Sequence, residues 1–185
     1  MKFNLHTLIL ASLVLTLGFA IHAGDLTAGM KKGKAELQSA GPLAFGPQGI
    51  LFVADPKAAS IFAIATSATS SPADTKSFKV KAVNEKIAAL LGTSADQILI
   101  HDLAVNPKSH HAYLSVSRGR GTGSKTVILR AEADGTLKEF SLDSVKFSQA
   151  KLPNAPEDKE VQRGRRRNNP RMESITDLAY LDWSS

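Results

Sequence analysis

The chain of 185 residues contains no cysteine and few aromatic residues, which make up 6% of the sequence. Without cysteine it can form no disulfide bond and cannot carry the lipid that bacterial lipoproteins attach to an N-terminal cysteine. An exported domain of this kind must be stabilised by its own hydrophobic core. No spacing of Ser, His and Asp, and no cluster of zinc-ligand type, points to a hydrolase or a zinc site.

The first 23 residues have the composition of a secretory signal peptide. Lys2 supplies a positive charge, residues 8–20 form an apolar run, and Ala23 is a suitable last residue before cleavage. The run is shorter than the roughly 20 residues that a membrane span needs, although an uncleaved anchor is the alternative. We therefore expect a periplasmic or secreted protein of residues 24–185, which is long enough for one domain.

The positive charge of the chain is concentrated in one segment. Removing Lys2 with the leader leaves 22 Lys and Arg against 17 Asp and Glu, a net charge of +5. Residues 163–171 contain five arginines and no acid. The rest of the mature chain is therefore neutral overall.

One sequence pattern occurs twice and begins a third time, and its Leu-Ala pair recurs at Leu43, Leu103 and Leu178. Each full copy alternates short apolar runs with turn residues, which predicts four antiparallel strands. The expected strands of the first copy are residues 43–45, 50–54, 60–66 and 75–80. Those of the second copy are residues 102–105, 112–117, 126–131 and 136–142.

Two insertions separate the copies. Residues 83–97 predict a helix with Asn84 as N-cap and Gly92 as its C-terminal stop, followed by a short helical turn at residues 94–97. Residues 151–171 are polar and contain three prolines, so we expect a long basic loop there.

The motif Pro-Leu-Ala-Phe-Gly-Pro-Gln-Gly-Ile-Leu-Phe-Val-Ala-Asp at residues 42–55, followed by Ser-Ile-Phe-Ala-Ile, resembles a blade of the NHL-type β-propellers. The YVTN-type and gluconolactonase-like propellers are similar. The resemblance implies an all-β fold of four-stranded antiparallel blades with one short helical insertion. It places blade 1 at about residues 35–80, blade 2 at about residues 98–142, and the first strand of a third blade at residues 174–182. It does not indicate a function, because propellers host many activities.

Two blades and one strand cannot close a propeller ring, and they would leave strand edges unpaired. We therefore expect a truncated product or a fragment. The alternative is a small open domain that pairs with itself.

Two other motifs resemble a phosphate-binding loop and a metal site, but their residues do not fit either one. Residues 119–126 approach a phosphate-binding loop, but Ser124 stands where glycine is required before Lys125, and a strand rather than a helix follows. This predicts an inter-strand loop and argues against nucleotide binding. His110 and His111 are adjacent and point in different directions, so they predict an exposed turn rather than a metal site.

Asp102 and Asp177 occupy the same position in the second and third copies, where the first copy has Gly41-Pro42. Gluconolactonase-like propellers hold a divalent cation with acidic and amide side chains at their channel, so the resemblance implies a metal site that includes both aspartates. The alternative is a carboxylate that caps the backbone where the strand begins.

The arginine-rich segment is the clearest functional signal, since it could bind phosphate, sulfated glycan or nucleic acid through charge. No aromatic residue lies near it to stack on a base, and a solvated loop is the alternative. Strand parity places this segment, the helix and the loop at residues 118–125 on one face, and such loops usually carry function. The candidate ligand-binding residues are Arg118, Arg120, Lys125, Arg163, Arg165, Arg166, Arg167 and Arg171.

Three functions follow from these observations. The first is an exported, non-enzymatic propeller scaffold without a cofactor, whose insertion face binds an unknown protein or an anionic ligand. The second is a gluconolactonase-like hydrolase that depends on a divalent cation and needs convergent acids from several blades. The third is a polyanion binder, whose affinity would fall steeply with salt.

Overall fold

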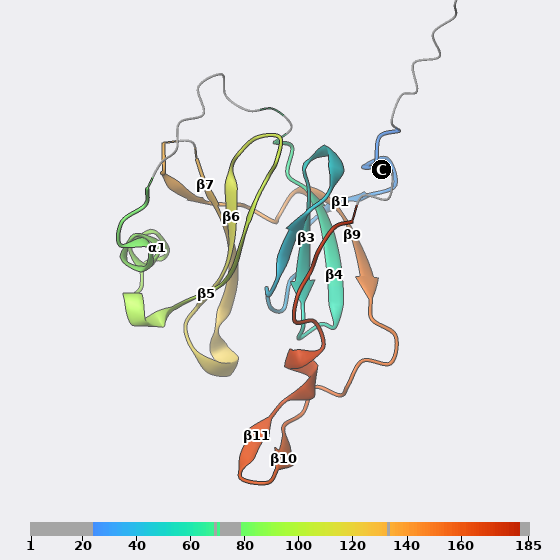
Figure 1. Cartoon of the computed structure of the whole chain (residues 1–185), viewed down its shortest axis with the longest axis vertical. Coiled ribbons are helices and arrows are strands. Elements are labelled where there is room, and N and C mark those ends of the chain that lie inside the picture. Colours follow the sequence, from blue (N-terminus) through green and yellow to red (C-terminus); the bar gives the residue numbers. More distant parts are fainter. Residues whose placement is uncertain (1–23, 69, 71–78, 133, 182–185) are drawn as a thin grey trace, which may run out of the picture.

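Two antiparallel β-sheets face each other and carry one α-helix on an outer side (Figure 1). The computed structural model describes residues 24–68, 70, 79–132 and 134–181. The predicted leader at residues 1–23 lies outside this part of the chain. The all-β class, the antiparallel pairing and the single helix agree with the sequence prediction.

Sheet A has five strands in the order β1-β9-β4-β3-β2. Their bounds are Lys31–Gly33 for β1, Val145–Lys151 for β9, Ser60–Ala65 for β4, Ile50–Asp55 for β3 and Leu43–Phe45 for β2. Sheet B has four strands in the order β5-β6-β7-β8. Their bounds are Ile98–Val105, Ala112–Arg118, Lys125–Ala131 and Leu137–Glu139. Sheet B therefore follows the order of the second sequence copy strand by strand.

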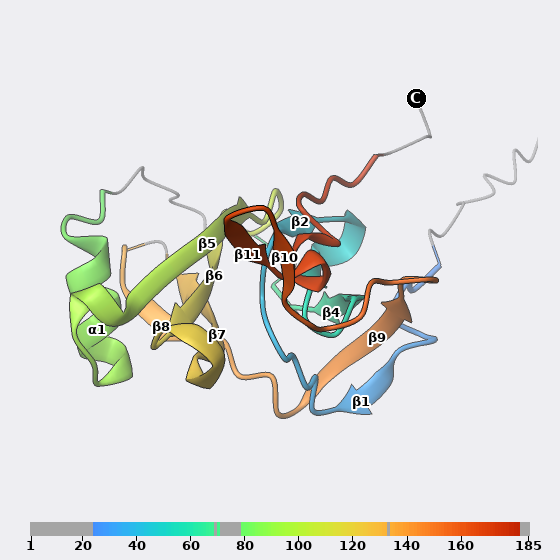
Figure 2. The ribbon, with the colours of Figure 1, turned by 90° about the horizontal axis from the view of Figure 1, so that it is seen from below.

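The fourth strand of sheet A differs from the prediction. Most of the expected strand at residues 75–80 lies outside the described residues, and Lys79 and Val80 belong to no strand. The position beside β4 is taken by β9, which follows sheet B in the chain and pairs Phe147 with Ile64. Because β9 lies outside the repeated pattern, its distant partner could not be read from the repeat. The chain thus returns to sheet A after completing sheet B (Figure 2).

The expected first strand of a third unit is not formed by the described residues 176–181. This segment lies instead over the outer face of sheet A, where the ring of Tyr180 stacks on Phe52 with centroids 6.0 Å apart. Ile175 just before it is buried. Tyr180 therefore contacts a sheet face instead of pairing in a strand, and it remains partly exposed there.

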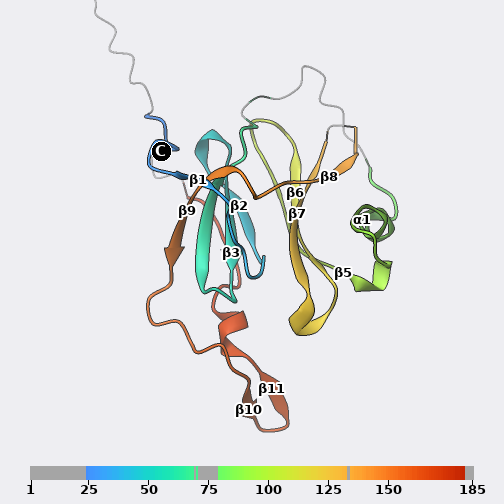
Figure 3. The same cartoon turned by 180° about the vertical axis from the view of Figure 1, so that it is seen from behind.

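Helix α1, Val83–Leu91, covers the outer face of sheet B (Figure 3). Its buried residues pack on Leu114, Val116, Val127 and Leu129. Gly92 ends the helix with a φ of 63°, as predicted, and the 3-10 turn Ala95–Gln97 follows.

The predicted cap of α1 is wrong, because the helix begins one residue before Asn84. The residue at the cap position is Ala82, in the left-handed conformation and without a side-chain cap. None of the described helices is long and apolar enough to cross a membrane.

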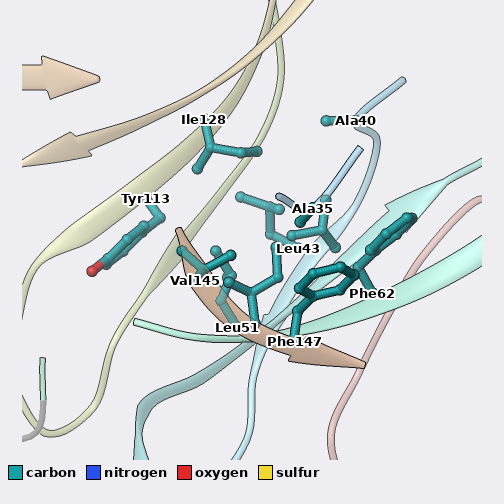
Figure 4. Close-up of a cluster of buried hydrophobic side chains, with 11 residues drawn as sticks. Ala35, Ala40, Leu43, Leu51, Phe62, Tyr113, Ile128, Val145 and Phe147 are labelled. Atoms are coloured by element: carbon teal, nitrogen blue, oxygen red, sulfur yellow. The ribbon is translucent and has the colours of Figure 1, made fainter. Parts of the chain in front are cut away.

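The main core lies between the two sheets (Figure 4). Its buried members are Ala35, Ala40, Leu43, Leu51, Val53, Phe62, Ile64, Tyr113, Ile128, Val145 and Phe147. The ring of Tyr113, from sheet B, lies edge-on between Phe45 at 5.2 Å and Phe140 at 5.5 Å. Fully burying one large apolar side chain stabilises a fold by roughly 1.5–3 kcal/mol. This shared core fixes the two sheets against each other and so determines which loops meet at each end.

Candidate functional site

The loop between β6 and β7 packs beside α1, as strand parity predicted. The Gly119 amide donates to the Gln97 carbonyl at 2.8 Å, and Arg120 Nε donates to the Asp96 carbonyl at 2.9 Å. Arg118 Nη2 donates to the carbonyl of Gly92, at 3.4 Å. Arg118 and Arg120 therefore hold the loop on the helical insertion, while Lys125 is exposed at the start of β7. The loop leads directly into a strand, as expected for an inter-strand connection.

The arginine-rich segment is not an irregular loop. It forms the hairpin β10 (Val161–Arg163) and β11 (Arg166–Asn168), which projects from the body of the molecule (Figure 1). Gly164 has a φ of 63°, which allows the two-residue turn between the strands. The sequence predicted a loop because residues 151–171 are polar, contain three prolines and show no apolar period.

The arginines of this hairpin have different environments. The side chains of Arg165, Arg166 and Arg167 are exposed at and beside the tip. Arg171 is half-buried at the base, and its Nε donates to the Pro156 carbonyl at 2.5 Å. Arg163 is placed by its backbone pairing with Arg166, and its side chain lies outside the description. Three of the predicted residues therefore remain candidates for direct binding at the tip.

Three of the acids near the hairpin, Glu157, Asp158 and Glu173, lie at its base and have their own partners. Glu157 pairs with Lys159, whose hydrogen bond and charge lower the pKa of that carboxyl group. Asp158 accepts a hydrogen bond from Asn169 at 2.6 Å, and Glu173 accepts one from Asn168 at 3.2 Å. Among the described residues, no ion pair involves the three exposed arginines at the tip. The tip is therefore cationic.

Asp102 binds backbone amides with both carboxylate oxygens. Its Oδ2 accepts from the amide of Leu43 in sheet A at 2.8 Å, and its Oδ1 accepts from Leu103 at 2.7 Å. Asp177 repeats the local contact, with Oδ1 accepting from the Leu178 amide at 2.8 Å. This is the backbone-capping role that the sequence offered as the alternative to metal binding. In the part of the chain described, no three His, Asp or Glu residues group to hold a metal ion.

His110 lies exposed in the turn between β5 and β6, as predicted, whereas the side chain of His111 is only 15% exposed. His111 Nε2 lies 3.4 Å from Glu132, which also binds Arg130 at 2.6 Å and Lys138 at 3.4 Å. Burial opposes the charged form of Glu132, but the two cations outweigh it, so the pKa of this carboxyl group is lowered. The sequence did not reveal this cluster, because its members come from separate strands and turns.

A second candidate site is a cleft of about 840 Å³ at the opposite end of the sheets. Its lining includes Ser144 and Val145, where β9 begins, whereas the arginine hairpin follows the end of β9. Both sheets and the segment before β1 contribute to it. No sequence motif marks this cleft, because its lining residues are widely separated in the chain.

Comparisons of the chain with known protein families, with curated proteins and with solved structures found no match. The assignment of a function therefore depends on the two sites described above, the arginine hairpin and the cleft.

Proposed function

We propose that this chain is an exported repeat protein of the β-propeller type and acts as a non-enzymatic binding scaffold for a polyanion. The single observation that carries the binding role is the group of three neighbouring arginines, Arg165, Arg166 and Arg167, which are exposed on a projecting hairpin and form no ion pair with any described residue. The propeller arrangement is supported by the similar strand order of the two sheets. It is also supported by the contact between β2 and β5, which are the first strands of the two repeat copies. The bond from Asp102 to Leu43 adds a polar link between the units.

The arginine side chain suits phosphate, sulfate and carboxylate groups, because its planar guanidinium group can donate two parallel hydrogen bonds. Arg166 and Arg167 are adjacent on β11, so their side chains leave opposite faces of the hairpin. Arg165 lies in the turn itself. The cations thus surround the tip instead of forming a flat patch. This arrangement favours a flexible linear polyanion that can bend around the hairpin over a rigid, flat partner.

The test measures the binding of a labelled heparin oligosaccharide and of inorganic polyphosphate to residues 24–185 by fluorescence anisotropy across a salt series. Three charge contacts predict a slope of log affinity against log salt of about −2 to −3. The R165Q/R166Q/R167Q variant should lose most of the affinity and of the salt dependence.

The matched control is K79Q/K81Q/K86Q, which removes the same charge from three exposed lysines at and before α1. It should bind nearly as tightly as the unchanged chain. Equal weakening by both triple variants would show that net charge alone drives binding, and the hairpin would then have no special role.

A further inference from the structure

The cleft at the far end from the hairpin has the size and the lining of a small-molecule site. Its volume of about 840 Å³ lies in the range of roughly 300–1,000 Å³ that ligand pockets occupy. Apolar surface comes from Ala65, Val145 and Phe140. Hydroxyl groups come from Thr27, Thr66, Ser67, Ser141 and Ser144. The other lining residues are polar or charged, and such groups around an apolar patch can hold an organic ligand in one orientation.

Cations outnumber acids in this lining. The five cationic residues are Lys32, Lys108, Arg130, Lys138 and Lys146, and the two acidic ones are Asp25 and Glu139. Arg130 and Lys138 share Glu132, but Lys32 and Lys108 form no ion pair within the described residues. Lys146 also forms no ion pair there, and these three lysines come from both sheets, with Lys32 on β1, Lys146 on β9 and Lys108 in the turn between β5 and β6.

The strand register adds an independent sign of uncompensated charge. Lys32 on β1 stands directly opposite Lys146 on β9. Like charges at directly opposed positions destabilise a strand pair. Lys146 Nζ donates to the Thr27 hydroxyl at 3.0 Å, and its charge also acts on Asp25, the carboxylate that Thr27 binds, so Lys146 is compensated only in part. An anion bound beside this pair would relieve the repulsion.

Tyr113 lies behind the cleft and is fully buried. Its hydroxyl group lies close enough to the Arg130 guanidinium to add to the rise in pKa that Glu132 causes in that group, although it meets no partner at full hydrogen-bond geometry among the described residues. The ring contacts Phe140, and the side chain adjoins Arg130, both of which line the cleft. The hydrogen bond to Glu132 raises the pKa of the Arg130 guanidinium, so the charge of this arginine at the cleft wall is already paired.

We propose that this cleft binds a small organic dianion, with one acidic group near Lys32 and Lys146, the other near Lys108, and an apolar body against Phe140. Two cationic groups contributed by different sheets match a ligand with acidic groups at both ends. A monoanion would satisfy only one of them. The site is separate from the hairpin and does not depend on it.

The experiment follows binding by isothermal titration calorimetry and by backbone amide chemical shifts on residues 24–185. The probes are isophthalate, which carries two carboxylates on a benzene ring, benzoate, which carries one, and the neutral isophthalamide. Isophthalate should bind at least tenfold more tightly than benzoate, and isophthalamide should not bind. The shift changes should cluster at the cleft residues Ser67, Lys108, Phe140 and Ser144.

Two lysine variants and one control locate the site. K108Q and K32Q should each weaken isophthalate binding about tenfold, whereas K57Q, at the β3–β4 turn on the opposite end, should leave it unchanged. The R165Q/R166Q/R167Q hairpin variant should also bind isophthalate normally. Equal affinity for isophthalate and benzoate, loss of binding in either control, or shift changes confined to the hairpin would each overturn the proposal.

Discussion

Replacing Asp55 should destabilise the fold more than replacing any exposed acid does. The sequence motif at residues 42–55 contains Asp55 but did not indicate this structural role. Asp55 is fully buried at the end of β3. Its Oδ2 accepts from the Gln38 amide at 2.7 Å, and its Oδ1 accepts from the Ser39 amide, the Ser39 hydroxyl and the Ala58 amide at 2.7–3.0 Å. One carboxylate thus joins the β3–β4 turn to the segment that leads into β2.

The size of the effect follows from these donors. A hydrogen bond to a charged group contributes roughly 1.5–3 kcal/mol. Gln38 is exposed, so water can replace its bond, while Ser39 and Ala58 are only partly accessible. We expect D55A to lower the free energy of unfolding by about 3–5 kcal/mol.

D55N keeps one acceptor oxygen but turns an amide donor toward Gln38, so its loss should be smaller, about 1–2 kcal/mol. S39A, which removes the bond to Asp55 and the bond from the Lys57 amide at 3.0 Å, should fall in the same range.

Urea unfolding followed by circular dichroism measures these differences. With a slope of about 1–3 kcal/mol per molar urea, D55A should move the midpoint by more than about 1 M. The control is D143A, whose ion pair with Lys34 is largely exposed and should matter by less than about 0.5 kcal/mol. A D55A loss below about 1 kcal/mol, or a D55N loss as large as that of D55A, would refute the role assigned to this carboxylate.

Two further changes test other contacts of the fold. D102A should lower the free energy of unfolding by about 2–4 kcal/mol in urea melts, because it leaves the amides of Leu43 and Leu103 without their charged acceptor; an unchanged midpoint would contradict this. Burial lowers the pKa of His101, so the folded chain prefers the neutral ring, and stability should fall as the pH drops through the ordinary histidine value near 6.5. H101Q should flatten the stability profile between about pH 7 and 5, whereas S117A, which removes only the partner hydroxyl, should retain the slope.

The local pattern of short apolar runs between turn residues predicted the central strands of each sheet. Residues 50–54 and 112–117 combine β-branched or aromatic residues with flanking turn residues, and both lie in strands. The same information could not predict the partner of β9, because the strands of sheet B separate β9 from its partner β4 in the sequence. It also could not show that residues 176–181 cover a sheet face, since a strand and a packed extended segment have similar patterns.

The candidate sites divide in the same way. Charge density in the sequence identified the arginine segment. Only the fold shows that Arg165 is exposed whereas Arg171 donates a hydrogen bond to a backbone carbonyl at the hairpin base. Symmetry of the repeat identified Asp102, and its two amide partners give it the backbone-capping role that the sequence offered as one alternative. No sequence signal indicated the cleft, because Lys32 and Lys108 are far apart in the chain and line the same cleft only in the folded structure.

The return of the chain to sheet A makes the two repeat units one structural unit. β9 pairs with β4 and also with β1, so sheet A cannot be completed until the chain has passed through sheet B. The core side chains Tyr113 and Ile128 of sheet B then pack against the same sheet that β9 completes. The cleft lies where β9 begins, beside Ser144 and Val145. An anion bound there would therefore stabilise the crossing between the sheets, so that binding and the closure of sheet A should be linked.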